Sequence, residues 1–293
     1  MSMFVRVSEV GPRDGLQNER SIVPVDAKVA FVDALVAAGL PEVEVTSFVH
    51  PGRVPQLADA AEVMARVRRA PCTVLSVLVP NERGLQAALA ARAQKVAVFV
   101  SASEGFSERN VGVGVEACLE RLRPVVVGGR AAGLPVRGYV SCVVRCPFDG
   151  PTSGERVRRV SEQLLAMGCT ELDLGDTIGA AEPVDMDALV EAMGPLVAPG
   201  QWTLHLHDTA GRAVACAERA LDLGVRSLDA SAAGLGGGPF ARGAPGNLAT
   251  ESLLELLDRR GFRHGVDLAA VRSAGQSMRE TLNRLHRDSG ATS

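Results

Sequence analysis

Two histidines lie one residue apart in the stretch "LHLHDTAG", at His205 and His207. If this apolar run is a strand, side chains two residues apart lie on one face, so both imidazoles point the same way. That geometry suits a metal site with two imidazole ligands. The alternative is a pair of hydrogen-bonded core histidines, because His-x-His alone lacks the four-ligand spacing of a zinc motif. The rest of the chain must decide between them.

A charged pair lies near the amino terminus, in "GPRDGLQNE", where Arg13 precedes Asp14. Asp14 alone is typical of a turn, since Asp-Gly is a common turn pair. Together with the two histidines it gives one carboxylate and two imidazoles, a set that suits a divalent ion with open positions for water or substrate. Arg13 either pairs with a surface acid or stabilises an oxyanion that develops next to the ion. The combination favours a metal site with Arg13 as a catalytic residue.

A repeated transition from helix to strand predicts the fold that positions these residues. Helical stretches end at Gly39, Gly133, Gly168 and Gly224, and an apolar strand follows within a few residues. Glycine fits the left-handed conformation that closes a helix. The runs with strand character are Val5–Val10, Val43–Thr46, Thr73–Val79, Lys95–Val100, Val136–Ser141, Glu171–Gly175, Trp202–His207 and Ser227–Ala230. Eight such βα units predict an α/β fold, the (β/α)8 TIM barrel, with a doubly wound sheet as the alternative.

Composition limits the class of protein. Apolar residues make up 46% of the 293 residues and charged residues 22%, which is enough for a sizeable core. No linker or shift of composition marks a boundary, so we expect one domain over residues 1–293, with a short flexible tail at about 287–293. The net charge of −3 and the scattered arginines give no basic face for nucleic acid.

The compartment is also an expectation from the sequence. The amino terminus shows no secretory signal, and no apolar run is long enough to cross a bilayer, so we expect a cytoplasmic protein without membrane partners. Six widely spaced cysteines favour reduced thiols. Cys142 and Cys146 are the closest pair, and their spacing is not that of a zinc knuckle or a redox motif.

In a TIM barrel the chemistry lies at the carboxyl ends of the strands, which is where the candidate residues fall. Glu44 lies within the second strand and needs a partner, because an unpaired buried carboxylate is unfavourable; Arg13 is the first candidate. Asn247 follows the glycine-rich run "GLGGGPFARGAPGN" and is either a helix N-cap or a metal ligand through its amide oxygen. The glycine spacing does not fit a dinucleotide fingerprint, and a mobile loop covering the site is the more economical interpretation.

These residues together resemble the 3-hydroxy-3-methylglutaryl-CoA lyase family of metal-dependent TIM-barrel lyases and aldolases. The similarity runs nearly end to end through the blocks "EVGPRDGLQNE", "EVTSFVHPGRVPQLAD", "SASEGFSERN", "YVSCVVRCPFDG", "LGDTIG", "HLHDTAG" and "GAPGNLATE". The resemblance implies a divalent ion, Mg²⁺ or Mn²⁺, with the ligands Asp14, His205, His207 and Asn247. It also implies that Arg13 stabilises an enolate, with Glu44, Asp176 and Glu251 supporting the site.

The reaction implied by the resemblance is a retro-Claisen cleavage of a tertiary 3-hydroxyacyl-CoA to acetyl-CoA and acetoacetate. His205 or Asp176 would remove the hydroxyl proton, and the carbon–carbon bond would break toward an enolate facing Arg13. The expected small-molecule partner is an acyl-CoA, and the expected assembly is a homo-oligomer, a dimer. Arg20 stands where the family often has a lysine near the CoA phosphates.

Three positions differ from the family pattern. The family's loop reads Gly-Leu-Gly-Gly-Cys-Pro, whereas this chain has Gly238 in place of the cysteine, and it has Gly52 and Arg53 where a Lys-Trp pair is usual. Because glycine leaves space, we expect the enzyme to accept a related, bulkier 3-hydroxyacyl-CoA. The alternatives are an aldolase or Claisen-type synthase acting on another 3-hydroxyacyl-CoA or a 2-oxo acid, and a metal-binding pseudoenzyme. Intact Arg13 and Asp14 argue against the last.

Overall fold

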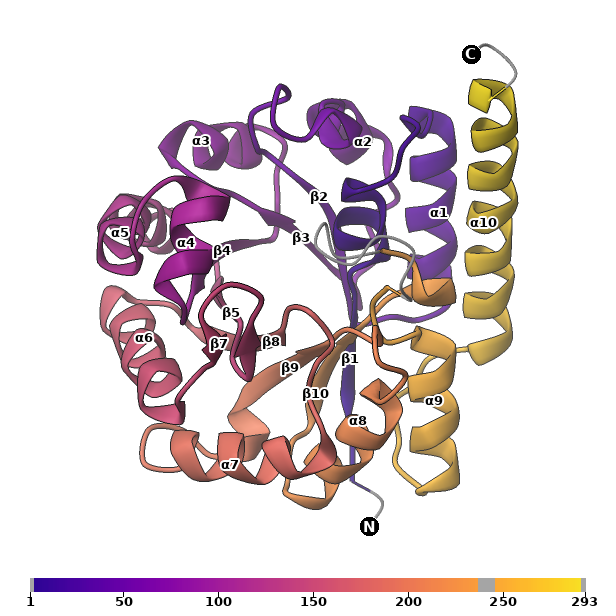
Figure 1. Ribbon diagram of the computed structural model, residues 1–293. Coiled ribbons are helices and arrows are strands. Elements are labelled where there is room, and N and C mark those ends of the chain that lie inside the picture. Colours follow the sequence, from indigo (N-terminus) through magenta and orange to yellow (C-terminus); the bar gives the residue numbers. More distant parts are fainter. Residues whose placement is uncertain (1–2, 237–245, 291–293) are drawn as a thin grey trace.

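Parallel strands close into a barrel in the computed structural model, which describes residues 3–236 and 246–290 (Figure 1). The barrel strands are β1 (Arg6–Glu9), β2 (Glu42–Ser47), β3 (Val74–Leu78), β4 (Lys95–Ser101), β5 (Val136–Ser141), β8 (Glu171–Asp176), β9 (Trp202–Leu206) and β10 (Ser227–Ala230). Because β1 pairs with β2 on one side and with β10 on the other, the sheet has no free edge. The predicted TIM barrel is confirmed, and the doubly wound alternative is wrong because that sheet stays open.

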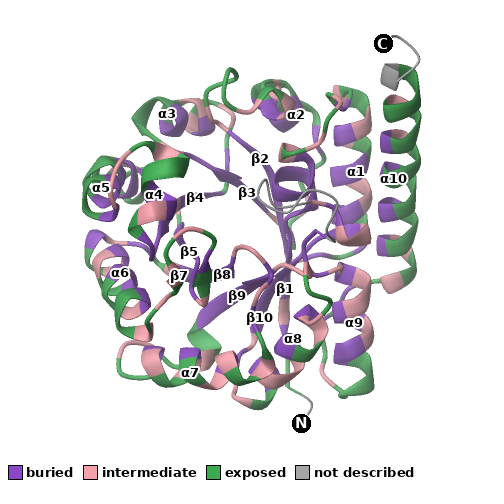
Figure 2. Cartoon of the chain, in the orientation of Figure 1, coloured by how far each residue is buried: buried purple, intermediate pink, exposed green. Residues whose placement is uncertain are grey.

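Helices surround this barrel, with their buried faces toward the strands and their exposed faces toward solvent (Figure 2). They are α1 (Val25–Ala37), α2 (Ala60–Arg66), α3 (Glu82–Ala90), α4 (Glu104–Val111), α5 (Val115–Ala131), α6 (Gly154–Met167), α7 (Pro183–Met193), α8 (Ala213–Asp222), α9 (Thr250–Arg259) and α10 (Leu268–Gly290). The last helix lies beside α1 and continues to Gly290. The first four residues of the expected flexible tail, 287–290, are therefore helical, and residues 291–293 lie outside the described residues.

The four glycines that the sequence places at helix ends have the expected backbone conformation. Their φ angles are 86° at Gly39, 78° at Gly133, 111° at Gly168 and 99° at Gly224. Gly168 is the left-handed residue that ends α6, and its amide donates to carbonyls of the last turn. Side chains with a Cβ rarely adopt such angles, so these positions fix where each helix stops and the next strand begins.

Two local elements carry no periodic signal, and the sequence analysis did not predict them. A two-stranded hairpin, β6 (Arg145–Cys146) with β7 (Gly150–Pro151), follows β5. A single π-helical turn, η1 (Gly11–Gly15), follows β1; the amides of Arg13, Asp14 and Gly15 all donate to the carbonyl of Val10. This turn folds the chain back over the end of β1, and so it holds Arg13 and Asp14 at the mouth of the barrel.

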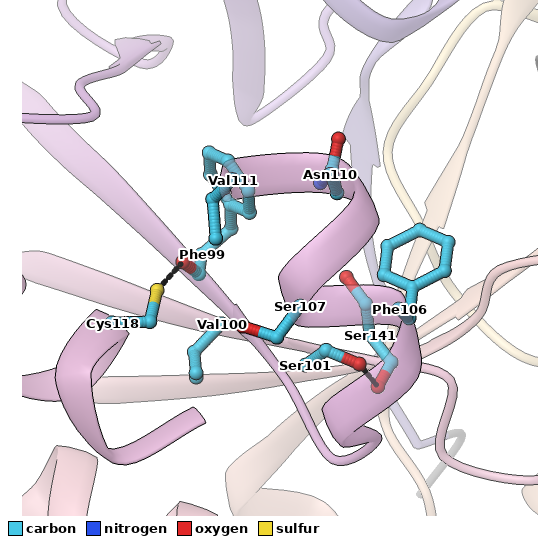
Figure 3. A pocket seen from close by; sticks show the side chains of 9 residues that line it. All are labelled: Phe99, Val100, Ser101, Phe106, Ser107, Asn110, Val111, Cys118 and Ser141. Atoms are coloured by element: carbon cyan, nitrogen blue, oxygen red, sulfur yellow. Dashed lines mark hydrogen bonds between the residues drawn. The ribbon is translucent and has the colours of Figure 1, made fainter. Parts of the chain in front are cut away.

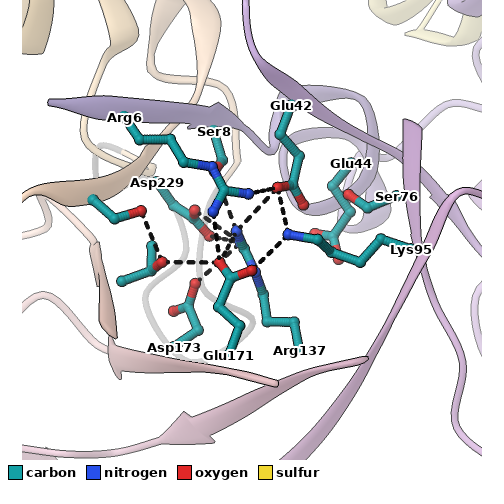
Figure 4. Close-up of polar contacts among 12 residues, drawn as sticks. Arg6, Ser8, Glu42, Glu44, Ser76, Lys95, Arg137, Glu171, Asp173 and Asp229 are labelled. Carbon is teal, nitrogen blue, oxygen red and sulfur yellow. Dashed lines mark hydrogen bonds and ion pairs between the residues drawn. The ribbon is translucent and has the colours of Figure 1, made fainter. Parts of the chain in front are cut away.

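The inside of the barrel is polar, although branched apolar side chains fill most TIM barrels. Alternate strand residues such as Leu172, Leu174, Leu204 and Leu206 belong to the apolar core. The residues between them meet across the barrel axis, where Figure 4 shows arginine, lysine and carboxylate side chains in one network. The alternation that predicted strands thus also separates an apolar layer from a charged interior.

Two further sequence expectations concern membranes and thiols. All six cysteines are free. Among the described residues, no helix has both the length and the apolar character of a bilayer span.

Candidate active site

One carboxylate and two imidazoles converge at the carboxyl end of the barrel. Asp14 comes from η1, His205 from β9, and His207 follows directly after β9. The Oδ2 atom of Asp14 lies 4.0 Å from Nε2 of His205 and 3.6 Å from Nε2 of His207. The centroids of the two rings are 5.0 Å apart, so they share one side of the strand as predicted. These three residues form a group whose ligand atoms could hold one metal ion.

The second nitrogen of each imidazole already has a partner. Nδ1 of His205 lies 3.3 Å from Oδ2 of Asp229, and Nδ1 of His207 lies 3.1 Å from the backbone oxygen of Asp176. Both partners are acceptors, so a ring that donates to them from Nδ1 has Nε2, the nitrogen on the side of Asp14, available for a metal ion. Metal-binding histidines have this arrangement, in which an outer acceptor fixes the tautomer and the ring orientation.

The contacts of Asn247 show whether this group of residues suits a metal ion. Its Nδ2 atom donates to Oδ2 of Asp14 at 2.9 Å and to the carbonyl of Leu235 at 3.0 Å. Its Oδ1 atom is buried without a hydrogen-bond partner among the described residues. An unpaired buried oxygen costs about 1–3 kcal/mol, and a cation would remove that cost. The set of a carboxylate, an amide oxygen and two imidazoles therefore fits a divalent ion.

The alternative for Asn247, a helix N-cap, is wrong. α9 begins at Thr250 and its N-cap position is Ala249, two residues further on. The approach of the preceding loop is close, since a Cβ on Gly236 would lie 2.6 Å from Nδ2 of Asn247. The φ angle of Gly236, 108°, also favours glycine there.

Arg13 pairs with Glu44, as predicted. Its Nε donates to Oε2 of Glu44 at 2.6 Å, and its Nη1 donates to Oδ1 of Asp14 at 2.5 Å. Burial opposes the charge of Asp14, but the neighbouring guanidinium overcomes this and holds the pKa of Asp14 below its usual range. Burial raises the pKa of Glu44, partly offset by Arg13. The site thus keeps a buried cation directly beside the carboxylate ligand.

Asp176 and Glu251 brace backbone turns around the site. The two carboxylate oxygens of Asp176 accept from the amides of Ala180 at 3.1 Å and Ala181 at 2.9 Å. Both oxygens of Glu251, in the first turn of α9, accept from the amide of Ala233 at 2.9 Å. Ala233 has a φ angle of 58°, so Glu251 stabilises a strained turn just after β10.

The structure does not bring Arg20, a predicted substrate-binding residue, into this cluster. Arg20 is exposed, a few residues beyond η1. Gly238 lies outside the described residues. A small cavity behind α4, lined by Ser107, Cys118 and neighbouring residues, is separate as well, because no member of the metal-binding group lines it (Figure 3).

Sequence reasoning missed three buried residues at the site. The hydroxyl of Tyr139 in β5 lies 3.2 Å from Oε2 of Glu44 and 3.2 Å from Oδ2 of Asp229 and can donate its one proton to either, and the ring of Tyr139 meets that of His205 edge-on. Asp229 of β10 supports His205. Tyr139 and Asp229 could have been found from the alternation along their strands, because both occupy positions that face the polar interior of the barrel.

The third missed residue, Glu9, ends β1 and joins three segments. Its Oε1 accepts from the amides of Gly11 at 2.8 Å and Ala232 at 2.9 Å, and its Oε2 lies 2.7 Å from the hydroxyl of Thr250. Burial raises the pKa of Glu9 to about 8. Glu9 thereby ties the turn that carries Asp14 to the segment that carries Asn247. A lone glutamate before Val-Gly-Pro gave no sign of these long-range contacts.

A closed α/β barrel with Asp, His, His, Asn and a paired arginine at its mouth defines a class of metal-dependent barrel proteins. The HMGL-like family model matches residues 4–278, and the chain belongs to this family.

Individual relatives and solved structures are similar to this chain over nearly its full length. The mitochondrial hydroxymethylglutaryl-CoA lyase of Gallus gallus is 48% identical over 280 residues, which cover 96% of this chain and 94% of that protein. The crystal structure of the HMG-CoA lyase from Brucella melitensis has a TM-score of 0.94 and 46% identity, covering 96% of this chain and all of that one. An HMG-CoA lyase from Acinetobacter baumannii, solved in complex with coenzyme A and 3-methylmalate, has a TM-score of 0.91 and 32% identity, covering 96% and 92%.

Proposed function

We propose that this chain is a divalent-metal-dependent carbon–carbon lyase that cleaves 3-hydroxy-3-methylglutaryl-CoA to acetyl-CoA and acetoacetate. The observation that carries the proposal is the convergence of Asp14, His205 and His207 on one point, with the unpartnered Oδ1 of Asn247 and the guanidinium of Arg13 beside them. Membership of the HMGL-like family and the lyase relatives support the same activity.

Asp14, His205, His207 and Asn247 would hold Mg²⁺ or Mn²⁺, since hard oxygen ligands with imidazole suit these ions. The bound ion would acidify the 3-hydroxyl of the substrate and orient the bond to be broken. Arg13 supplies the positive charge that faces the enolate, and Glu44 fixes the orientation of that charge. Tyr139 lies against both residues and helps to exclude water from this part of the site.

His205 and Asp176 are the two candidates for the residue that accepts the hydroxyl proton. Nε2 of His205 has the free lone pair for this role but cannot hold an ion and a proton together, while the oxygens of Asp176 already accept two backbone amides. Asp176→Asn separates the two assignments. A fall in kcat of about 10²–10⁴-fold assigns the proton to Asp176, and a small fall with a raised KM leaves Asp176 as a brace of the loop.

The activity itself is tested with protein stripped of metal by a chelator and reloaded with Mg²⁺ or Mn²⁺. A panel of 3-hydroxyacyl-CoA thioesters is offered, and acetyl-CoA is measured by mass spectrometry. We expect metal-dependent release of acetyl-CoA from 3-hydroxy-3-methylglutaryl-CoA. Turnover that survives complete metal removal, or no acetyl-CoA from any thioester, contradicts the proposal.

The same panel tests the second candidate, a related aldolase or Claisen-type synthase that uses another 3-hydroxyacyl-CoA or a 2-oxo acid. Gly52, Arg53 and Gly238 favour it, because they replace residues usual in the family. Preference for a bulkier thioester, reversed by Gly238→Cys, would select this alternative.

The remaining assignments are part of the same proposal. The partner is an acyl-CoA, which the complex of the Acinetobacter relative with coenzyme A supports, and the exposed Arg20 is a candidate contact for its phosphates. The assembly is a homodimer, which light scattering on purified protein tests. The compartment is the cytoplasm, supported by six free thiols and tested by fractionation of the source cells.

A further inference from the structure

The two imidazoles of the site are held by different kinds of acceptor. His207 donates from Nδ1 to a backbone carbonyl, that of Asp176, which no substitution of a side chain removes. His205 donates from Nδ1 to a side chain, the carboxylate of Asp229. The orientation of His205 therefore depends on a residue that nothing above places in the reaction.

Asp229 is well placed to hold this ring. It is buried in β10, and its register partner in β9 is His205 itself. Its Oδ1 accepts from Nη1 of Arg137 at 3.0 Å, and its Oδ2 also lies 3.2 Å from the hydroxyl of Tyr139. Asp229 thus presents a carboxylate oxygen to Nδ1 of His205, and Arg137 and Tyr139 hold that carboxylate from two other sides.

A neighbouring aspartate provides an internal comparison. Asp173 of β8 is equally buried and binds the same Nη1 atom of Arg137, at 3.2 Å (Figure 4). No hydrogen bond joins Asp173 to His205 among the described residues, and Oδ1 of Asp173 has no partner in that part of the chain. Burial and the nearby Asp229 raise the pKa of Asp173 well above its usual value. The two residues therefore share surroundings but differ in their contact with His205.

We propose that Asp229 is a positioning residue, which keeps the proton of His205 on Nδ1 and so presents the unprotonated Nε2 to the metal ion. The proposal rests on the metal-binding part of the proposed function. An amide in place of this carboxylate can donate to Nδ1, and the ring then carries its proton on Nε2, where it blocks the ion. Loss of an outer partner of this kind typically weakens metal affinity by about 10- to 100-fold.

The test compares Asp229→Asn with Asp173→Asn in the full chain. Mn²⁺ affinity is measured by electron paramagnetic resonance, and the tautomer of His205 in metal-free protein is read from ¹H–¹⁵N spectra. The chain has five histidines, so His205→Gln assigns the signal. We expect Asp229→Asn to bind Mn²⁺ about 10- to 100-fold more weakly and to show the Nε2–H tautomer. Asp173→Asn keeps a group that can donate to Asp229, and we expect affinity within about twofold of the unchanged protein.

Each other outcome overturns the proposal. Unchanged affinity and tautomer in Asp229→Asn show that His205 is oriented without Asp229. Equal weakening in both variants shows that the buried network, rather than this one contact, sets the affinity. If Asp229→Asn does not fold, the spectrum of the unchanged protein still decides, because an Nε2–H tautomer of His205 there contradicts the proposal. Failure of the unchanged protein to bind Mn²⁺ would instead contradict the proposed function, and the tautomer measurement would remain valid.

Discussion

Polar and ionisable side chains gather at both ends of this barrel, but the two groups differ in which of their atoms have partners. At the amino end, Lys95 donates to Glu42 at 2.7 Å and to Glu171 at 2.5 Å, and Arg6 pairs with the same two carboxylates. At the carboxyl end, the Nε2 atoms of His205 and His207 lie 4.0 Å and 3.6 Å from Oδ2 of Asp14, and Oδ1 of Asn247 has no hydrogen-bond partner among the described residues. The charged groups at the amino end pair with one another. At the carboxyl end, metal-ligand atoms are directed at one common position.

This difference separates a structural charge cluster from a binding site. Taking ions out of water is costly, and only close partners and complete hydrogen bonding recover that cost. The network at the amino end has its partners within the chain, with Arg137 reaching from it to Asp229 in the middle of the barrel. The cluster at the carboxyl end places the ligand atoms of Asp14, His205 and His207 around one position, which a divalent ion would occupy in the proposed function. Burial and charge alone would not have distinguished the two ends.

Removal of a ligand should give the largest effect. In His207→Gln we expect activity to fall by at least about 10³-fold, because a catalytic metal contributes several kcal/mol to transition-state stabilisation. Mass spectrometry measures the metal content, and steady-state kinetics measure the activity. His264→Gln is the control, since His264 is a buried histidine that pairs with Asp258 at 3.0 Å, outside the metal-binding group. Equal losses of activity in the two variants would show that the histidines at the carboxyl end are no more important for the reaction than His264.

The opposite end should respond in stability and not in turnover. In Lys95→Met, Glu42 and Glu171 lose one cation but keep Arg6 and Arg137 as partners, so we expect the free energy of unfolding to fall by less than about 3–5 kcal/mol, the cost of leaving a buried charge unpaired. Urea denaturation measures this change. We expect kcat per folded molecule to stay the same, because Lys95 lies at the far end of the barrel from Asp14. A fall in kcat with intact stability would show that the amino end takes part in the reaction.

Arg13→Met should lower kcat by about 10²–10³-fold with a smaller change in KM, because the guanidinium is needed mainly when the enolate forms. Arg6→Met is the comparison at the other end, where an arginine also pairs with buried carboxylates. There we expect lower stability and unchanged kcat. Steady-state kinetics on metal-loaded protein decide, and an unchanged kcat in Arg13→Met excludes Arg13 from the reaction.

Much of this architecture is predictable from local patterns, because alternation and helix-ending glycines are local. The strands, the shared face of His205 and His207, and the pairing of Arg13 with Glu44 all follow from spacing or from the need to pair a buried charge. Asp229, Tyr139 and Glu9 do not, since their partners lie on distant strands and only closure of the barrel brings them together. The sequence also left the role of Asn247 open between an N-cap and a metal ligand, because only the structure shows that α9 begins at Thr250 with Ala249 at its N-cap position.

The smallest expected effect concerns Glu9. It distinguishes the two ends of the barrel by the way their stability depends on pH. The pKa of Glu9 is raised to about 8 by burial, whereas that of Glu171 is lowered to about 2 because Arg137 and Lys95 overcome the effect of burial. Between about pH 4.5 and 8 the folded protein therefore binds more protons at Glu9 than the unfolded chain does. The free energy of unfolding then falls as pH rises, by at most about 1.4 kcal/mol for each pH unit.

Glu9→Gln should remove this slope, because the amide keeps an oxygen acceptor for the two backbone amides but does not titrate. Glu171→Gln should lower stability by a constant amount across pH 5–8, since the titration of Glu171 lies below that window, with its stabilising effect lost only as the pH falls from about 4.5 toward 2. Chemical denaturation of the three proteins at pH 5, 6, 7 and 8 measures both slopes. Parallel curves for the unchanged protein and Glu9→Gln would mean that Glu9 is already ionised at pH 5, bound as an anion by Gly11, Ala232 and Thr250, and that the turn carrying Asp14 is insensitive to pH in this range.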